Sequence, residues 1–302
     1  MPALRLISDS LWTFWRQGRP VERTGYRVGA ILLVSGLVHL GLLVAGGGSW
    51  DGPLSLRKPA TFGLSFGVTL VTIVWVASFL RLTARARAAL LGAFTVACAL
   101  ETALVSLQAW RGVPSHFNVE TTFDSAVVRM QAGGGAALIE IIVVLTVAAF
   151  RTNQTVPTSL RIAIRVGLVS LCGSLAVGAW MIARGMVLVF TGHPQAAYAT
   201  GGFLKPTHAV TMHGVLVLPL LAWLLSLSPW SERRRLALVL VASASYVLLV
   251  AIVAVANILG LELQQVFAGG VALFALGALA LVATYFAAAE PARPARRSRD
   301  GP

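Results

Sequence analysis

The dominant pattern in the chain is a series of long apolar runs separated by short polar segments. A helix needs about 20 apolar residues to cross a bilayer, and eight runs reach that length. They lie at 28–47, 60–80, 89–110, 128–150, 163–183, 207–228, 236–258 and 266–287. The pattern predicts an all-α, polytopic transmembrane helix bundle of about eight spans that occupies residues 28–288.

Both ends of the chain are predicted to lie outside the bilayer core. Residues 1–27 mix apolar side chains with arginines, which is typical of an amphipathic helix at the membrane interface. Residues 289–302 form a basic tail that we expect to be disordered.

Composition agrees with a membrane protein. The chain of 302 residues is 57% hydrophobic and 12% charged, whereas soluble domains are about 25% charged. An ordinary soluble globule and a disordered chain are therefore excluded. The net charge of +13 comes from arginines between the apolar runs, so it indicates membrane topology rather than a nucleic-acid partner.

The basic residues also predict an orientation. Eighteen of the 24 lysines and arginines fall on one side if the spans alternate in direction, and such an excess marks the cytoplasmic side. Both termini are then cytoplasmic, in a bacterial inner membrane. The opposite, periplasmic side collects histidines, acids and an asparagine, and we expect the functional face there.

Four ionisable residues stand out inside predicted spans, where burial is costly and a functional role is expected. His39, Glu101, Glu140 and His213 all lie about 9–15 Å below the outer end of their spans. Together they are candidates for a transition-metal site. Axial ligation of a b-type haem is a second candidate, for which the possible ligands are His39, His116, His208 and His213. The alternative is that each residue only forms hydrogen bonds between helices.

Two of these histidines share one span. His208 and His213 are five residues apart, which places them about 140° apart around a helix. We therefore expect them to face different neighbours.

A polar stripe follows the third span outward. Glu101, Gln108 and Arg111 share one helix face because they are separated by seven and three residues. The loop after them begins the next helix with Thr121 and Asp124, and we expect Arg129 to pair with Asp124 or Glu120. The predicted outer pocket consists of Lys58, Glu101, Gln108, Arg111, His116, Asn118 and Lys205.

Glycine and proline give further packing signals. Gly63 and Gly67 form a small-xxx-small pair, which favours close helix contact, while Gly133 to Gly135 pack closely or leave room for a ligand. Lys58-Pro59 and Lys205-Pro206 are each followed, after seven residues, by Gly-Val. This match makes the second and sixth spans equivalent in a parallel four-plus-four repeat, a plan known in transporters.

Three strings of residues resemble an uncharacterised family of bacterial polytopic membrane proteins. One is Lys58 to Phe62 with Ser65 and Phe66. Another runs from Glu101 through Gln108 and Arg111 to Asn118. The third contains His208, Met212-His213 and Val217 to Leu220. The resemblance adds weight to these residues and implies no reaction.

Several functions remain open. The first is a redox or cofactor protein that binds b-type haem or a metal near the outer leaflet. The second is a transporter or channel for a small polar or anionic solute, with Glu101 coupling protons. Its electropositive mouth would consist of Arg57, Lys58, Arg111, Arg184 and Lys205. A zinc hydrolase acting on lipid and an accessory subunit of a larger membrane complex are the others.

Overall fold

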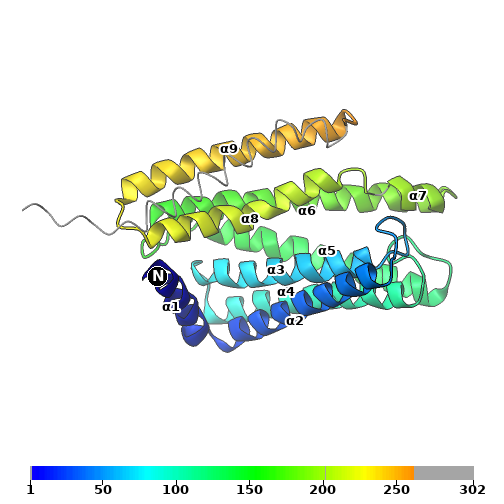
Figure 1. Ribbon diagram of the computed structural model, residues 1–302, viewed down its shortest axis with the longest axis horizontal. Coiled ribbons are helices and arrows are strands. Elements are labelled where there is room, and N and C mark those ends of the chain that lie inside the picture. The colour runs from blue at the N-terminus through cyan, green and yellow to red at the C-terminus, as the bar shows by residue number, and fades with distance from the viewer. Residues whose placement is uncertain (1, 201, 262–302) are drawn as a thin grey trace, which may run out of the picture.

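The computed structural model describes residues 2–200 and 202–261, and within these residues its only regular secondary structure is helix (Figure 1). The helices are α1 (Pro2–Gln17), α2 (Pro20–Ala45), α3 (Arg57–Ser78), α4 (Ala84–Trp110), α5 (Thr122–Ala149), α6 (Thr158–Phe190), α7 (Pro194–Thr200), α8 (Lys205–Ser226) and α9 (Glu232–Ile258).

Seven of these helices are long and apolar enough to cross a membrane. They are α2, α3, α4, α5, α6, α8 and α9, and they contain the first seven predicted spans. The protein is therefore a multi-pass membrane protein with a helical bundle. The eighth predicted span, 266–287, and the tail at 289–302 lie outside the described residues.

Several helices begin before their predicted spans, and α2 and α6 depart most from the apolar pattern. The second helix begins at Pro20 rather than near residue 28, because Pro20 fits the first turn and Glu22 accepts a 2.7 Å hydrogen bond from the Arg19 backbone N–H. The sixth continues to Phe190 instead of ending near residue 183. Together with α7, this extension makes most of the segment 184–206, between two predicted spans, helical.

The bundle has two chemically different ends (Figure 1). We call one the mouth end: it holds the loops 46–56 and 111–121 and the starts of α3 and α8. The other is the arginine-rich end, which holds α1 and the starts of α2, α4, α6 and α9. There the Phe14 ring of α1 packs edge-on against Trp75 and Phe79 of α3, with ring centroids 6.2 and 5.7 Å apart.

Glycines allow α2 and α3 to approach closely. A Cβ added to Gly36 would lie 2.6 Å from the Leu64 backbone nitrogen, and one on Gly63 would lie 2.6 Å from the Gly36 nitrogen. A Cβ on Gly67 would lie 2.9 Å from the Gly29 carbonyl oxygen. The close contact predicted from Gly63 and Gly67 is confirmed.

Helices α6, α8 and α9, in the second half of the bundle, repeat the arrangement of α2, α3 and α4 in the first half. A Cβ on Gly167 of α6 would lie 3.0 Å from the carbonyl oxygen of Gly214, the residue that matches Gly67 in the Lys-Pro alignment. The most extensive packing in the bundle joins α2 to α3 and α6 to α8. The contacts α3–α4 and α2–α4 recur as α8–α9 and α6–α9. These pairings support the parallel repeat, with α3 and α8 as equivalent helices that meet between the halves.

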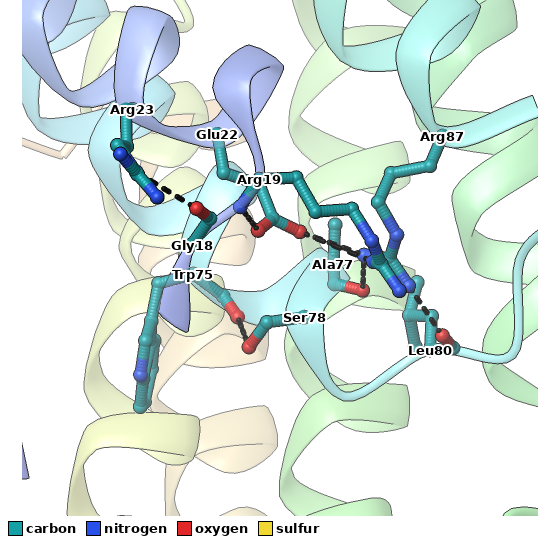
Figure 2. Close-up of polar contacts among 9 residues, drawn as sticks. All are labelled: Gly18, Arg19, Glu22, Arg23, Trp75, Ala77, Ser78, Leu80 and Arg87. Atoms are coloured by element: carbon teal, nitrogen blue, oxygen red, sulfur yellow. Dashed lines mark hydrogen bonds and ion pairs between the residues drawn. The ribbon is translucent and has the colours of Figure 1, made fainter. Parts of the chain in front are cut away.

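A buried ion pair fastens the arginine-rich end of the first half (Figure 2). Arg87 of α4 lies 3.3 Å from Glu22 of α2, and both side chains are almost fully buried. The same guanidinium donates to the carbonyl oxygens of Ala77 at 2.5 Å and Leu80 at 2.9 Å. Arg87 thereby adds hydrogen bonds to two carbonyls at the C-terminal end of α3 while joining three helices.

A pair of glycine substitutions on α2 tests the close packing. We expect Gly36→Ala to destabilise the protein by about 1–3 kcal/mol because the new methyl group must displace α3. Gly41→Ala is the matched control, since a Cβ there meets nothing within 4 Å. Thermal unfolding of the purified protein should show a lower midpoint for G36A alone. Equal midpoints would contradict this packing.

Candidate functional site

Three cationic side chains lie near one another at the mouth end. Arg57 and Lys58 begin α3, and Lys205 begins α8. The positive charges of Lys205 and Arg57 repel that of Lys58, and Arg57 also repels Lys205. The negative charge of Asp51 attracts Lys205. Within residues 2–200 and 202–261, none of the three forms an ion pair within 4.0 Å. We call Arg57, Lys58 and Lys205 the cationic mouth.

His116 lies beside this mouth. Its ring centroid is 5.6 Å from that of Phe62 on α3, and its Nδ1 is 3.0 Å from the Ser115 hydroxyl. Burial, followed by the nearby positive charge of Lys58, lowers the pKa of His116 to about 4. The imidazole is therefore neutral at pH 7 and offers a hydrogen bond rather than a charge.

The loop that carries His116 is anchored at both ends by one polar network. Arg111 contacts Asp124 at 2.5 Å and also donates to Gln108, whose amide donates to Asp124 at 2.9 Å. Thr121 donates to Asp124 at 2.6 Å and accepts a hydrogen bond from its backbone N–H. The expected helix cap at Thr121 is confirmed, but the partner of Asp124 is Arg111, not the predicted Arg129. No ion pair of Glu120 is found among the described residues either.

The middle of this loop is held by a strained residue. Phe117 has a φ of 66°, which is rare for a residue with a bulky side chain. Its ring fills the space above Gly185 of α6, where an added Cβ would overlap the ring. Ser115 and Asn118 are buried beside it, and the Asn118 amide nitrogen has no hydrogen-bond partner among the described residues. The loop therefore links the first half of the bundle to the second.

A cleft of about 200 Å³ lies between α3 and α8, farther from the mouth end than Lys58 and Lys205. Its polar lining comes from Ser65, Thr69 and Thr72 of α3 and from His213 of α8. The other lining residues are Leu64, Val68, Met212, Val215 and Leu216. Ser65, Val68 and Thr69 match Met212, Val215 and Leu216 in the Lys-Pro alignment, so the cleft lies where equivalent surfaces of the two halves face each other.

The histidines of the predicted cofactor site are separated. His39 uses both ring nitrogens: Nδ1 lies 2.8 Å from the Ser35 carbonyl oxygen, and Nε2 accepts from Trp110 at 3.0 Å. His208 faces α6, where its Nδ1 lies 2.8 Å from the Ser174 carbonyl oxygen. His213 is exposed in the α3–α8 cleft. As expected from their spacing, His208 and His213 face different neighbours.

The two glutamates of the predicted metal site also face different ways. Glu101 is buried and lies against Gly134 of α5, whereas Glu140 is on the exposed side of α5. Across the residues that the structure describes, no three His, Cys, Asp or Glu side chains gather as a metal site. Matched depth therefore did not bring His39, Glu101, Glu140 and His213 to one point.

All three arginines of the predicted electropositive mouth have other partners. Arg111 pairs with Asp124, and Arg184 lies 4.4 Å over the ring of Phe203. Arg57 donates from Nε to the Trp50 carbonyl oxygen at 2.8 Å and lies 5.9 Å over the Trp50 ring. Sequence reasoning also missed the Glu22–Arg87 pair and the Ser174–His208 contact. Both join residues that lie more than 30 positions apart, and no local spacing signals them.

Comparisons with known protein families, with curated proteins and with solved structures find no match to this chain.

Removal of the Asp124 charge should release the 111–121 loop. We expect Asp124→Asn to weaken the contacts with Arg111 by about 2 kcal/mol, which corresponds to roughly 30-fold faster amide exchange if the loop opens locally. Glu120→Gln, at an exposed position of the same loop, is the control. Unchanged exchange in D124N would show that the network does not hold the loop.

The lowered pKa of His116 predicts a pH dependence of stability. Between pH 6.5 and about 4 the unfolded chain binds a proton at His116 that the native protein does not bind, so this residue's contribution to stability falls as the pH falls. Thermal unfolding of wild type and His116→Gln should therefore diverge in this window, with the wild type losing more stability. Parallel curves would place His116 in a solvated environment instead.

Proposed function

We propose that this protein binds a small anionic solute at the cationic mouth and carries it into the membrane between its two halves. The observation that carries the proposal is the meeting of Arg57, Lys58 and Lys205 without an ion-pair partner among the described residues. Like charges held together are costly, and an anion bound between them removes that cost. The nearby Asp51 compensates only in part.

The chemistry of the mouth suits an oxyanion. Lysine and arginine supply charged N–H donors, and hydrogen bonds between charged groups are about twice as strong as neutral ones. The neutral His116 ring next to Lys58 adds a further polar group without adding charge. Phosphate, sulfate and short carboxylates are therefore the ligand class that we expect.

The arrangement of the helices supports a route beyond the mouth. Transporters built from parallel repeats bind their substrates where the repeats meet, near the middle of the bilayer. Here α3 and α8 meet in that way, and the polar lining of their cleft begins about 10 Å below Lys58, because Ser65 follows it by two helical turns. The clustered arginines at the other end of the bundle favour a cytoplasmic location for that end and a periplasmic mouth.

The geometry gives the redox or metal hypothesis less support. Both ring nitrogens of His39 are already engaged, and His208 and His213 face different neighbours. A role as an accessory subunit of a membrane complex remains an alternative, but no described contact points to a partner.

An anion-binding measurement with charge-matched variants tests the proposal. Phosphate, sulfate and succinate are titrated into the protein in phosphatidylcholine nanodiscs by calorimetry. We expect Lys58→Gln and Lys205→Gln each to weaken binding about tenfold or more, because each removes a charge-assisted hydrogen bond worth about 1.5–3 kcal/mol. Arg129→Gln is the control, since it removes the same charge from an exposed position on α5.

The nanodisc composition separates a soluble anion from a lipid headgroup. If anionic phosphatidylglycerol abolishes phosphate binding at low salt and high salt alike, the mouth holds a headgroup rather than a solute. If R129Q weakens binding as much as K58Q does, or if none of the three anions binds, the proposed site is wrong.

A further inference from the structure

The polar side chains most in need of a ligand lie between α4 and α5, away from the cationic mouth. Glu101 is 4% exposed and Gln131 is 6% exposed. The Glu101 Oε1 atom and both polar atoms of the Gln131 amide are buried without a hydrogen-bond partner in the described part of the chain. Buried polar groups are almost always paired, so three such atoms indicate an unfilled hydrogen-bonding requirement at one place.

Helix geometry places these two side chains at the same depth. The antiparallel helices α4 and α5 are joined near the mouth end by the hydrogen bond from Gln108 to Asp124. Seven residues deeper along each helix, about 10 Å, are Glu101 and Gln131. Glu101 lies directly against α5, because a Cβ on Gly134, one turn from Gln131, would overlap its Oε1 atom.

Among the residues that the structure describes, Glu101 forms no ion pair within 4.0 Å. The helices packed against α4 are α2, α3 and α5, and the charged or titratable groups nearest to it lie toward the two ends of the bundle. At the arginine-rich end are Glu22, Tyr26 and Arg87; at the mouth end are His39, Arg57, Lys58, Arg111 and Asp124. Between them is the thiol of Cys98, one turn from Glu101 on α4, while Arg129 and Glu140 lie on the exposed face of α5.

The burial of an unpaired carboxylate in a membrane is far more costly than the burial of the neutral acid. A carboxylic acid and a carboxamide are also complementary: the acid O–H can donate to the Gln131 oxygen, and the Gln131 N–H can donate to the acid carbonyl. A sodium ion would need more oxygen ligands than this pair offers.

We propose that Glu101 and Gln131 form a proton-binding site within the membrane, reached from the mouth end through Gln108, Asp124 and Arg111. The bound proton makes Glu101 a neutral acid that pairs with the Gln131 amide. Only the coupling of this site to anion binding rests on the proposed function. The network that ends at Asp124 also anchors the loop that carries His116, so release of the proton can alter the cationic mouth.

Infrared spectroscopy of the full-length protein tests the site without any anion. At pH 7 the wild type should show the C=O stretch of a protonated carboxylic acid, shifted in D₂O, and Glu101→Gln should lose one such band. Glu120→Gln is the control, because it makes the same substitution at an exposed glutamate and should leave the acid bands unchanged. Glu140 is present in all three proteins, so its contribution to the spectrum cancels in the comparison.

Two further variants keep the test decisive if E101Q does not fold. Glu101→Asp should shift the band rather than remove it, and Gln131→Leu should shift it in the direction of a weaker hydrogen bond. If no variant at Glu101 changes the acid bands, the residue is ionised and the proposal fails. If sodium instead shifts the carboxylate stretch in wild type alone, the site binds a cation and not a proton.

Coupling is tested separately in proteoliposomes. Acidification outside should speed phosphate uptake by the wild type, and E101Q should lose this acceleration while it still binds phosphate. K58Q should lose phosphate binding but keep the infrared band. Absence of the acid band from the wild type, with phosphate binding intact, would thus overturn the proton site alone. The acid band in a wild type that binds none of the anions would overturn the anion site alone.

Discussion

The close approach of two helix pairs through glycine is the constraint on which the rest of the structure depends. In a bilayer the hydrophobic effect does not drive helices together, so helix contact relies on van der Waals packing between small residues. Gly36 against Gly63 joins α2 to α3, and Gly167 against Gly214 joins α6 to α8. These contacts make α3 and α8 the inner helices of two similar halves, and their first turns carry Lys58 and Lys205 to the same place.

The two ends of the bundle differ in whether their cationic side chains have ion-pair partners. At the arginine-rich end Arg87 is paired with Glu22 and donates to two carbonyls at the C-terminal end of α3, so its charge is compensated (Figure 2). At the mouth end Lys58 and Lys205 have no such partner among the described residues. A buried pair is costly to break and holds helices in place, whereas unpaired cations at a surface are available for a ligand.

Hydropathy was sufficient to predict the seven spans, and residue spacing predicted the glycine packing, the cap at Thr121 and the divergence of His208 from His213. Neither hydropathy nor spacing predicted which side chains contact one another. Depth along a helix fixes height but not direction: Gly134 faces Glu101, and Glu140, six residues on, is turned about 120° away from it. The pairing of Arg111 with Asp124 depends on the path of the 111–121 loop, which includes the left-handed Phe117 and has no local signal.

The central claim is that equivalent positions of the two halves, Lys58 and Lys205, are close enough to share one anion. The most direct measurement is cross-linking of a Lys58→Cys, Lys205→Cys double variant in membranes with a short bifunctional thiol reagent, with Cys98 and Cys172 replaced by alanine. The account predicts an efficient cross-link within one chain, and little with Arg129→Cys in place of Lys58→Cys. Equal yields for the two pairs, or no cross-link between positions 58 and 205, would contradict it.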